Sequence, residues 1–258
     1  MATMLKIDIR RGRILEKLKK DGTVSVSQLA SELGATPVTI RSDLDALEAE
    51  GYLVRVQGGA VQNHKMPDPP QVSARESEHA EEKRRIARCV AEMVHDGDTL
   101  FLNSGSTVQF VAKALRVRKN LNIVTNSLNV AYELGNMPSF RVILLGGEIN
   151  AHYSFTYGSD AQEQLSHYQA DWAIMSLDGI DAEAGLTTYH AEEATINRMM
   201  ISHSKQVLVT ADHTKVGRAG FFRFHEPGEN IRLVTDEQFS PSVAADLQLL
   251  GVDVTIAK

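Results

Sequence analysis

The stretch TPVTIRSDLDALEAEG, residues 36–51, decides the fold of the N-terminal part of the chain, because it predicts one complete helix with both ends marked. Thr36 is a candidate N-cap, since its hydroxyl can accept a hydrogen bond from an otherwise unpaired amide of the first turn. Pro37 suits the first helical position, and Gly51 can close the helix in a left-handed conformation. Apolar residues at helical spacing form one narrow stripe between these ends: Ile40, Leu44 and Leu47.

The face of this helix opposite the apolar stripe is small and polar, with one long cation near its N-terminal end. It consists of Val38, Thr39, Arg41 and Ser42. Such a face can lie in the major groove of DNA and place short side chains against base edges. An ordinary amphipathic helix with a solvated face has the same pattern, so the neighbouring segments decide between the two interpretations.

The residues before this helix predict two further helices. The first spans residues 10–20 and is rich in Lys and Arg, and the second spans Val26–Leu33 with Ser25 as its cap. Gly34–Ala35 then makes a tight turn into the helix that begins after Thr36. A short helix, a turn with glycine and a second helix form a helix-turn-helix arrangement.

The residues after this helix predict a two-stranded ribbon. Tyr52–Val56 alternates like a strand, and Ala60–Gln62 forms a second strand beyond Gly58–Gly59. Arg55 lies near the tip of the ribbon. Together with the basic first helix, it is placed to contact the phosphate backbone, so we interpret the ribbon as a wing.

The sequence VSVSQLASELGATPVTIRSDLDALEAEGYLVRVQGGAV, residues 24–61, resembles the N-terminal domain of the DeoR family of bacterial transcriptional regulators. The resemblance implies a helix-turn-helix motif over about Val24 to Asp43 and double-stranded operator DNA as a partner. The residues expected at the DNA are Ser25, Thr36, Val38, Thr39, Arg41, Ser42, Arg55 and Gly58. The family often has a second arginine where this chain has Ser42, whose hydroxyl cannot make the bidentate contact of arginine with guanine.

Charge is distributed unevenly along the 258 residues. The net charge of −6 argues at first against nucleic acid, but residues 1–65 contain ten Lys and Arg against eight Asp and Glu, a net of +2. The hydrophobic content of 43% is enough for a sizeable core. The N-terminus has no apolar signal-peptide region, and no apolar run approaches membrane length, so we expect a cytoplasmic protein that does not contact the membrane.

The sequence offers no pattern for a metal or a cofactor. Cys89 is the only cysteine, which excludes an intrachain disulfide and a zinc site built on a cysteine cluster. The nine histidines lack metal-ligand spacing, and no Gly-x-Gly-x-x-Gly occurs. We therefore expect neither a metal nor a cofactor.

The Pro-rich composition of residues 64–75 predicts a linker between a DNA-binding domain, residues 1–63, and an α/β domain, residues 76–258. The second domain opens with a long charged helix over Glu76–Val94. Strand and helix patterns then alternate, which predicts a mainly parallel sheet covered by helices. The expected strands are Thr99–Leu102, Asn122–Thr125, Arg141–Leu145, Trp172–Ser176, Gln206–Thr210, Ile231–Thr235 and Val252–Ile256.

Small, polar or charged residues follow five consecutive strands of this sheet. Ligands bind at the carboxyl ends of parallel strands, so the five loops predict a polar pocket. The first loop, Asn103–Thr107, opens directly into a helix, where backbone amides favour an anion. The candidate ligand-binding residues are Asn103, Ser104, Gly105, Ser106, Thr107, Thr125, Asn126, Ser127, Gly147, Asp178 and Lys215.

Residues 76–256 resemble the C-terminal sensor domain of the DeoR family, including Gly185-Leu186-Thr187-Thr188. The resemblance implies a Rossmann-like domain related to ribose-5-phosphate isomerase and CoA-transferases, with a phosphorylated sugar or sugar-derived effector. It places the phosphate on Ser104–Thr107 with help from Thr125–Ser127, and the sugar near Asp178 and Lys215. The family frequently has Asp where this chain has Asn103, so we expect a different ligand contact there, or one negative charge fewer beside the phosphate.

The two resemblances together predict a DNA-binding regulator, a repressor of a carbohydrate-utilisation operon, without catalytic residues of its own. A single DNA-binding module gives modest specificity, so we expect a homodimer or homotetramer that binds repeated half-sites. The alternative is an isomerase-like enzyme with a DNA-binding appendage, in which Asp178, Asp181 and Lys215 supply acid and base. Loop-edge ion pairs are a third explanation of the same three residues.

Overall fold

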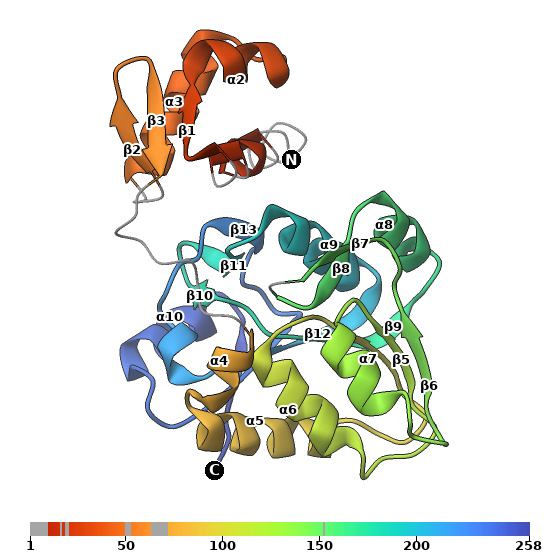
Figure 1. The fold of residues 1–258 in the computed structure, drawn as a ribbon. Coiled ribbons are helices and arrows are strands. Elements are labelled where there is room, and N and C mark those ends of the chain that lie inside the picture. Colours follow the sequence, from red (N-terminus) through yellow and green to blue (C-terminus); the bar gives the residue numbers. More distant parts are fainter. Residues whose placement is uncertain (1–9, 16, 19–20, 50–52, 63–71, 152) are drawn as a thin grey trace. The chain divides into compact units, whose positions relative to one another are not determined.

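The computed structural model of the protein describes residues 10–15, 17–18, 21–49, 53–62, 72–151 and 153–258 (Figure 1). The chain divides into two compact units, Met1–Pro69 and Pro70–Lys258. The expected fold class, a helix-turn-helix domain followed by an α/β domain with a parallel sheet, is confirmed.

The N-terminal unit has three helical segments and a small sheet. The described residues of 10–18 are helical, and α2 (Val26–Glu32) and α3 (Pro37–Ala49) follow. The hydroxyls of Ser25 and Thr36 accept hydrogen bonds from the amides of Gln28 and Thr39, both at 3.2 Å, as N-caps do. Ile40, Leu44 and Leu47 are fully buried, so the predicted stripe of α3 faces the core.

The predicted ribbon of β2 (Leu53–Val56) and β3 (Gly59–Gln62) gains a third strand, β1 (Thr23–Ser25), which pairs antiparallel with β3. Sequence reasoning missed β1 because its three residues lead directly into the cap of α2. In the register of this sheet Ser25 lies opposite Gly59. A Cβ atom at Gly59 would lie 1.9 Å from the carbonyl oxygen of Val24, so only glycine allows the two strands to approach so closely.

An ion-pair cluster joins the first helix to α3. Asp43 is only 3% exposed, and its carboxylate accepts hydrogen bonds from Arg10 at 2.5 Å and from Arg11 at 3.2 Å. Two of the basic residues expected at the DNA backbone are therefore engaged inside the unit, whereas Arg13 of the same helix is exposed.

The C-terminal unit contains a seven-stranded parallel sheet in the order β15-β14-β12-β9-β4-β5-β6. The strands are β4 (Thr99–Leu102), β5 (Asn122–Thr125), β6 (Arg141–Leu144), β9 (Ala170–Met175), β12 (Ser204–Thr210), β14 (Ile231–Thr235) and β15 (Asp253–Ile256). Each lies within three residues of the bounds predicted from the sequence.

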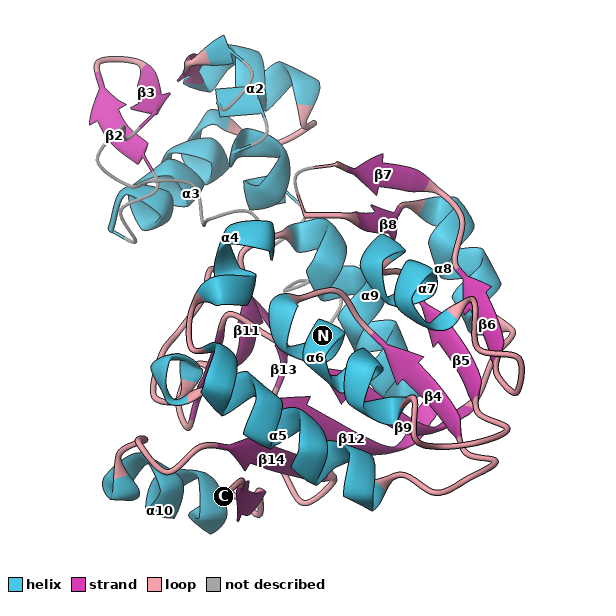
Figure 2. Cartoon of the chain, turned by 60° about the horizontal axis from the view of Figure 1, so that its bottom comes forward, coloured by secondary structure: helices cyan, strands magenta, loops and turns pink. Residues whose placement is uncertain are grey.

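Helices cover both faces of this sheet (Figure 2). Leu100 and Leu102 of β4 point into the core under one set of helices, whereas Phe101 points into the other core, as the alternation of a strand requires. The first set is α5 (Ala80–Met93), α6 (Ser106–Leu115) and α7 (Leu128–Leu134), and the second is α8 (Ser159–Ser166), α9 (Ala191–Ser202) and α10 (Pro241–Leu249).

The strand order reverses direction between β4 and β9. From β4 the chain adds β5 and β6 on one side, and later adds β12, β14 and β15 beyond β9 on the other side. Such a switch point leaves a crevice outside the carboxyl ends of the two central strands, where ligands bind in open α/β sheets. The topology therefore predicts that the residues after Leu102 and Met175 line a binding site.

The long helix predicted over Glu76–Val94 is broken in two. α4 (Val72–Ser77) and α5 are separated at His79, whose φ of 51° is left-handed and interrupts the helix. The start of α4 falls within the segment expected to be a linker. Short antiparallel strands that the sequence analysis did not predict extend the unit: β7 (Glu148–Asn150), β8 (Phe155–Tyr157), β10 (Gly179–Asp181), β11 (Gly185–Thr188) and β13 (Phe222–His225).

Candidate functional site

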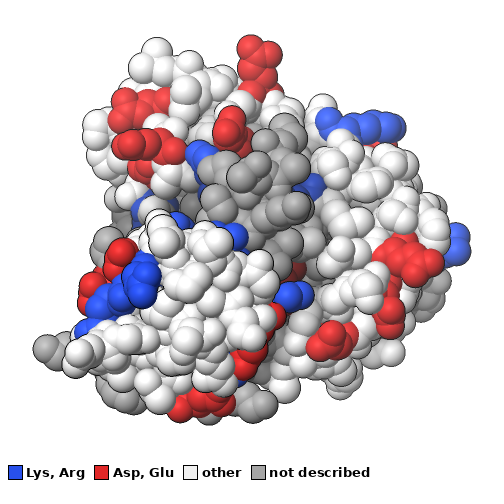
Figure 3. Space-filling model, turned by 90° about the horizontal axis from the view of Figure 1, so that it is seen from above, with Lys and Arg blue, Asp and Glu red and all other residues white. Residues whose placement is uncertain are grey.

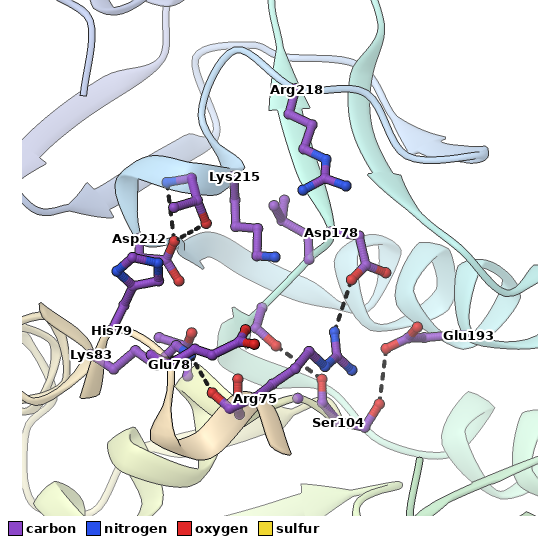
Figure 4. A pocket seen from close by; sticks show the side chains of 16 residues that line it. Arg75, Glu78, His79, Lys83, Ser104, Asp178, Glu193, Asp212, Lys215 and Arg218 are labelled. Carbon is purple, nitrogen blue, oxygen red and sulfur yellow. Dashed lines mark hydrogen bonds and ion pairs between the residues drawn. The ribbon is translucent and has the colours of Figure 1, made fainter. Parts of the chain in front are cut away.

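A cavity of about 210 Å³ opens at the switch point of the C-terminal unit (Figure 4). Its walls come from the loops after β4, β9 and β12, from the junction of α4 and α5, from Glu193 of α9, and from Arg218. The pocket therefore gathers segments that lie more than 140 residues apart in the sequence, from Arg75 to Arg218. Of the five strand-end loops predicted to converge, three line this cavity.

The loop after β4 forms a cradle of small residues at the start of α6. Ser104, Gly105, Ser106 and Thr107 all line the pocket. Gly105 is the N-cap of α6 with a φ of 136°, and a Cβ atom there would lie 1.9 Å from the hydroxyl of Ser176. That hydroxyl donates a hydrogen bond of 3.0 Å to the carbonyl of Ser104. The first amides of a helix lack partners within the helix, so this cradle favours an anion.

The side chain of Asn103 lies inside the protein and is not among the residues that line the pocket. Its amide group donates to the carbonyl of Ser176 at 2.9 Å and to the side-chain oxygen of Asn197 at 3.1 Å, and its own oxygen accepts from the amide of Ser176 at 2.9 Å. The amide thus ties the end of β4 to the end of β9. An ionised aspartate could accept a hydrogen bond from Ser176 but could not donate one to its carbonyl. Only an amide side chain makes both hydrogen bonds, which explains asparagine at this position.

Asp178 follows β9 and is held from three sides. Its carboxylate accepts hydrogen bonds from the guanidinium of Arg75 at 3.0 Å, the hydroxyl of Thr188 at 3.1 Å and the amide of Tyr189 at 3.0 Å. Asp178 is 6% exposed, and a buried charge is costly unless it is paired and hydrogen-bonded. Each of these three hydrogen bonds therefore stabilises the buried carboxylate. Figure 4 shows Arg75 reaching from α4 across the pocket toward Asp178.

Glu193 of α9 stands beside Asp178 and holds a proton unusually tightly. Its carboxyl group accepts a hydrogen bond from Ser104 at 2.9 Å and lies 2.5 Å from the hydroxyl of Thr188, whose single proton cannot be donated to both Glu193 and Asp178. Burial raises the pKa of Glu193 from its ordinary value of 4.5 to about 7, and the negative charge of Asp178 adds to this rise. The pocket therefore contains a carboxyl group that changes charge near neutral pH.

Replacing Glu193 with glutamine should make the stability of the C-terminal unit less dependent on pH. The folded protein keeps the Glu193 proton up to about pH 7, whereas the unfolded chain releases it near pH 4.5, so folding takes up a proton between these values. The free energy of unfolding should therefore fall as the pH rises through this window, by at most about 1.4 kcal/mol per pH unit from this group. The Glu193→Gln variant should lack that part of the fall.

The fluorescence of Trp172, the only tryptophan of the chain and a residue of β9, can follow urea unfolding of this unit at pH 5, 6 and 7. Glu192→Gln changes the neighbouring carboxyl, which does not line the pocket, and serves as the control. Equal pH slopes for wild type and Glu193→Gln would contradict the assignment of the raised pKa to Glu193.

Four cations line the same pocket: Arg75, Lys83, Lys215 and Arg218. The ammonium of Lys83 is buried, which lowers its pKa, and it donates to the carbonyls of Arg75 and Glu78 at 2.6 and 2.7 Å. Arg218 donates to the hydroxyl of Tyr189 at 2.8 Å. The ammonium of Lys215 makes no hydrogen bond or ion pair with any other described residue, and the side chain points into the cavity (Figure 4).

Four predicted residues from the second and third strand ends do not line this pocket. Thr125, Asn126 and Ser127 are buried, and Ser127 caps α7 by accepting a hydrogen bond from the amide of Val130. Asn126 donates to the carbonyl of Thr156 at 3.2 Å. Gly147 packs against β8, where a Cβ atom would lie 2.3 Å from the carbonyl oxygen of Tyr157. Their contacts in the structure are with α7 and β8.

Asp181, the third residue of the predicted acid–base set, is also outside the pocket lining. Its carboxylate accepts hydrogen bonds from the amides of Glu183 and Ala184 at 2.9 and 3.0 Å, which shapes the turn between β10 and β11. Within the described ranges, no group of three or more His, Cys, Asp or Glu residues could hold a metal ion. Across the same residues, no helix is long and apolar enough to span a bilayer.

The candidate DNA-binding face of α3 is exposed within the N-terminal unit. Val38 is 71% exposed, and Arg41 and Ser42 are exposed as well. Thr36 and Thr39 are joined through their hydroxyls at 2.9 Å in the first turn. The side chain of Arg41 makes no hydrogen bond or ion pair with another described residue. This face is therefore available to a partner without unfolding the unit.

Arg55 of the wing is turned toward α3. Its guanidinium contacts the carboxylate of Asp45 and donates to the carbonyl of Gly59 at 3.1 Å. Gly58, with a φ of 83°, forms the turn of the wing, and its carbonyl accepts a hydrogen bond from Val26 at the start of α2. The wing is thus bonded to both α2 and α3. Among the described residues on the face in Figure 3, Lys and Arg are interspersed with Asp and Glu.

Sequence reasoning missed the pocket residues Arg75, Lys83 and Glu193, which lie on helices, and Glu78 and His79, which lie between α4 and α5. A signal for two of them existed. Lys83 precedes the buried residues Ile86 and Val90 at helical spacing, and Glu193 precedes the buried Asn197 and Met200 in the same way. A charged residue within the apolar stripe of a helix is unusual unless it has a buried partner.

Comparison with known proteins gives matches over both units. The family model of the DeoR C-terminal sensor domain matches residues 78–237, and that of the DeoR-like helix-turn-helix domain matches residues 10–66. The chain is 34% identical over 245 residues to the HTH-type transcriptional repressor GlcR of Bacillus subtilis, covering 95% of this chain and 94% of that protein. It is 37% identical over 209 residues to the glycerol-3-phosphate regulon repressor of Escherichia coli, covering 81% and 82%.

Solved structures show weaker similarity. The probable sor operon regulator of Shigella flexneri aligns with a TM-score of 0.42 at 12% identity, covering 72% of this chain and 94% of that one. Ribose-5-phosphate isomerase A of Methanocaldococcus jannaschii aligns with a TM-score of 0.40 at 14% identity, covering 54% and 55%.

Proposed function

This chain belongs to the DeoR family of transcriptional regulators, and we propose that it represses a carbohydrate-utilisation operon until a phosphorylated sugar, or a compound derived from one, fills the pocket of its C-terminal unit. The observation that carries the proposal is the presence, in one chain, of an exposed helix-turn-helix face and a polar pocket in which the ammonium of Lys215 has no partner among the described residues. The similar proteins named above are repressors, one of them of a glycerol-3-phosphate regulon.

In the proposed complex, the phosphate lies on the cradle Ser104–Thr107 at the start of α6, with Lys215 as its counter-charge. Asp178 and Glu193 are placed to accept hydrogen bonds from sugar hydroxyls. The cavity of about 210 Å³ is smaller than the roughly 300–1,000 Å³ of pockets for drug-sized ligands. We therefore expect an effector no larger than a phosphorylated monosaccharide.

On the DNA side, α3 enters the major groove of the operator with Val38, Thr39, Arg41 and Ser42 toward the bases. The exposure of this face and the N-capped start of α3 support the proposal. A single helix-turn-helix contacts too few base pairs for high specificity, so we expect a homodimer or homotetramer on repeated half-sites. The effector can change DNA affinity only if it binds the two states of the protein unequally.

Replacing Lys215 with glutamine should weaken the binding of phosphorylated effectors at least tenfold, because the ammonium has no other described partner and a buried charge pair with phosphate is lost. Binding is measured by thermal shift and titration with glycerol 3-phosphate, ribose 5-phosphate, fructose 6-phosphate and glucose 6-phosphate, each beside its unphosphorylated form. Lys119→Gln, at an exposed position outside the pocket lining, is the control. Equal stabilisation by phosphorylated and unphosphorylated compounds would refute the phosphate site.

A second candidate function is sugar-phosphate isomerisation in the same pocket. It is favoured by the two adjacent carboxyls, Asp178 and Glu193, because a group with a pKa near 7 suits proton transfer. Turnover of any of the four phosphates above, abolished in Asp178→Asn, would support an enzyme. The similarity of both units to repressors makes the regulator the better-supported proposal.

A further inference from the structure

Arg75 occupies an unusual position, because it belongs both to the pocket and to the start of the C-terminal unit. It lies on α4, the first described helix after the wing, and residues 63–71 between them are outside the described ranges. Its side chain is 16% exposed and makes its ion pair with Asp178 at 3.0 Å. A residue more than 100 positions away in the sequence thus fixes the beginning of this unit.

The guanidinium of Arg75 has binding capacity left over. Its Nε atom is buried and has no hydrogen-bond partner among the described residues, although a buried N–H without a partner is costly. The planar guanidinium can donate two parallel hydrogen bonds to an anion, which a single bond to Asp178 does not use. The centre of the Tyr153 ring lies 5.8 Å from the guanidinium carbon, a cation–π contact that does not accept a hydrogen bond from the Nε atom.

Lys83 holds the backbone around Arg75 in place, because its ammonium donates hydrogen bonds to the carbonyls of Arg75 and Glu78. The junction of α4 and α5 is therefore anchored at two points: by Lys83 through the backbone, and by Asp178 through the Arg75 side chain. Only the second anchor is a side-chain ion pair that faces the cavity (Figure 4). An anion that reached this guanidinium would compete with Asp178 for its N–H donors.

We propose that Arg75 transmits the occupancy of the pocket: Asp178 holds its guanidinium while the pocket is empty, and the phosphate of the effector takes the guanidinium over. The attachment of α4 then changes whenever the pocket fills, at the point where the chain arrives from the DNA-binding unit. This inference rests on the proposed function, because it requires an anionic effector in this pocket. It adds Arg75 as an effector ligand and Asp178 as its internal competitor.

A double-mutant cycle on the full-length protein tests the competition, with inorganic phosphate as the probe and calorimetric titration as the measurement. Phosphate lacks sugar hydroxyls, so direct contacts of Asp178 with a sugar do not enter. Asp178→Asn should tighten phosphate binding about tenfold, and Arg75→Gln should weaken it by about the same factor. In the Arg75→Gln background, Asp178→Asn should change the phosphate affinity less than about twofold, because there is then no guanidinium for which Asp178 and phosphate compete.

Asp212→Asn supplies the matched control, since Asp212 lines the same pocket but bonds to Thr214. Its effect on phosphate affinity should be the same with and without Arg75. Arg75→Lys keeps the charge without the planar fork and should bind phosphate with intermediate affinity, which guards against a folding defect of the glutamine variant. If Asp178→Asn tightens binding equally in both backgrounds, Asp178 acts by simple repulsion and the inference is wrong.

Amide hydrogen exchange in residues 72–79 tests the consequence for α4. Saturating phosphate should change the exchange rates there at least twofold in the wild type and leave them unchanged in Arg75→Gln. An equal response in both proteins, or none in a wild type that binds phosphate, would overturn the inference while leaving the proposed function intact. A wild type that binds neither phosphate nor any of the four sugar phosphates would instead refute the proposed function, and the inference with it.

Discussion

Replacing Arg41 with alanine should lower the affinity for operator DNA by at least about thirtyfold. A bidentate contact of arginine with a guanine is worth about 1–3 kcal/mol, and a dimer on two half-sites loses two such contacts. The fold of the N-terminal unit should not change, because the Arg41 side chain is exposed and has no described partner within the protein. The loss should therefore appear in DNA binding alone.

The operator is obtained first, by selecting sequences that bind the wild-type protein from random double-stranded DNA. Binding of the variant is then measured on the selected operator and on an unrelated duplex. Arg84→Ala removes an exposed arginine from α5 of the C-terminal unit and should change operator affinity less than about twofold. Wild-type affinity of Arg41→Ala for the selected operator would exclude α3 as the helix that contacts the bases.

Replacing Gly59 with alanine should destabilise the N-terminal unit by about 3 kcal/mol or more. The new Cβ atom would overlap the backbone carbonyl of Val24, which cannot move without separating β1 from β3. Gly58→Ala is the matched comparison, because that Cβ atom would meet open space and only the left-handed φ of 83° opposes it. We expect a cost of about 1 kcal/mol there.

Amide exchange over residues 23–62 measures the opening of this unit separately from the rest of the chain. Exchange should accelerate about a hundredfold in Gly59→Ala and about fivefold in Gly58→Ala. Operator affinity should decrease in the same order, because the wing and α3 are joined through Arg55. Equal acceleration in the two variants would mean that the close approach of β1 to β3 is unimportant for stability.

The sequence predicts the parallel sheet well because each strand carries its own signal. Buried strands such as Thr99–Leu102 and Ile231–Thr235 are short apolar runs that end at polar loops, and their bounds agree with the structure. The start of α3 is equally well marked, since the cap and the proline stand next to each other. A sequence pattern predicts an element well when the residues within that element determine its bounds.

The remaining features depend on contacts between distant residues. β1 is a strand only through its pairing with β3, in which Ser25 lies opposite Gly59. The break between α4 and α5 lies at His79, where no proline or glycine in the sequence predicts the end of a helix. The pocket shows the same limit. Its small loop after β4 can be predicted from the sequence, whereas Arg75 enters it only through a partner 103 positions further along the chain.

The position of Arg75 also bears on how a chimeric repressor should be assembled. The match to the sensor-domain family begins at residue 78, so a graft made at that boundary would take Arg75 from one parent and Asp178 from the other. Such a hybrid would keep its helix-turn-helix and its sheet, yet inherit a mismatched pair at the junction. A crossover before residue 72 keeps α4 with the sensor to which it is bonded.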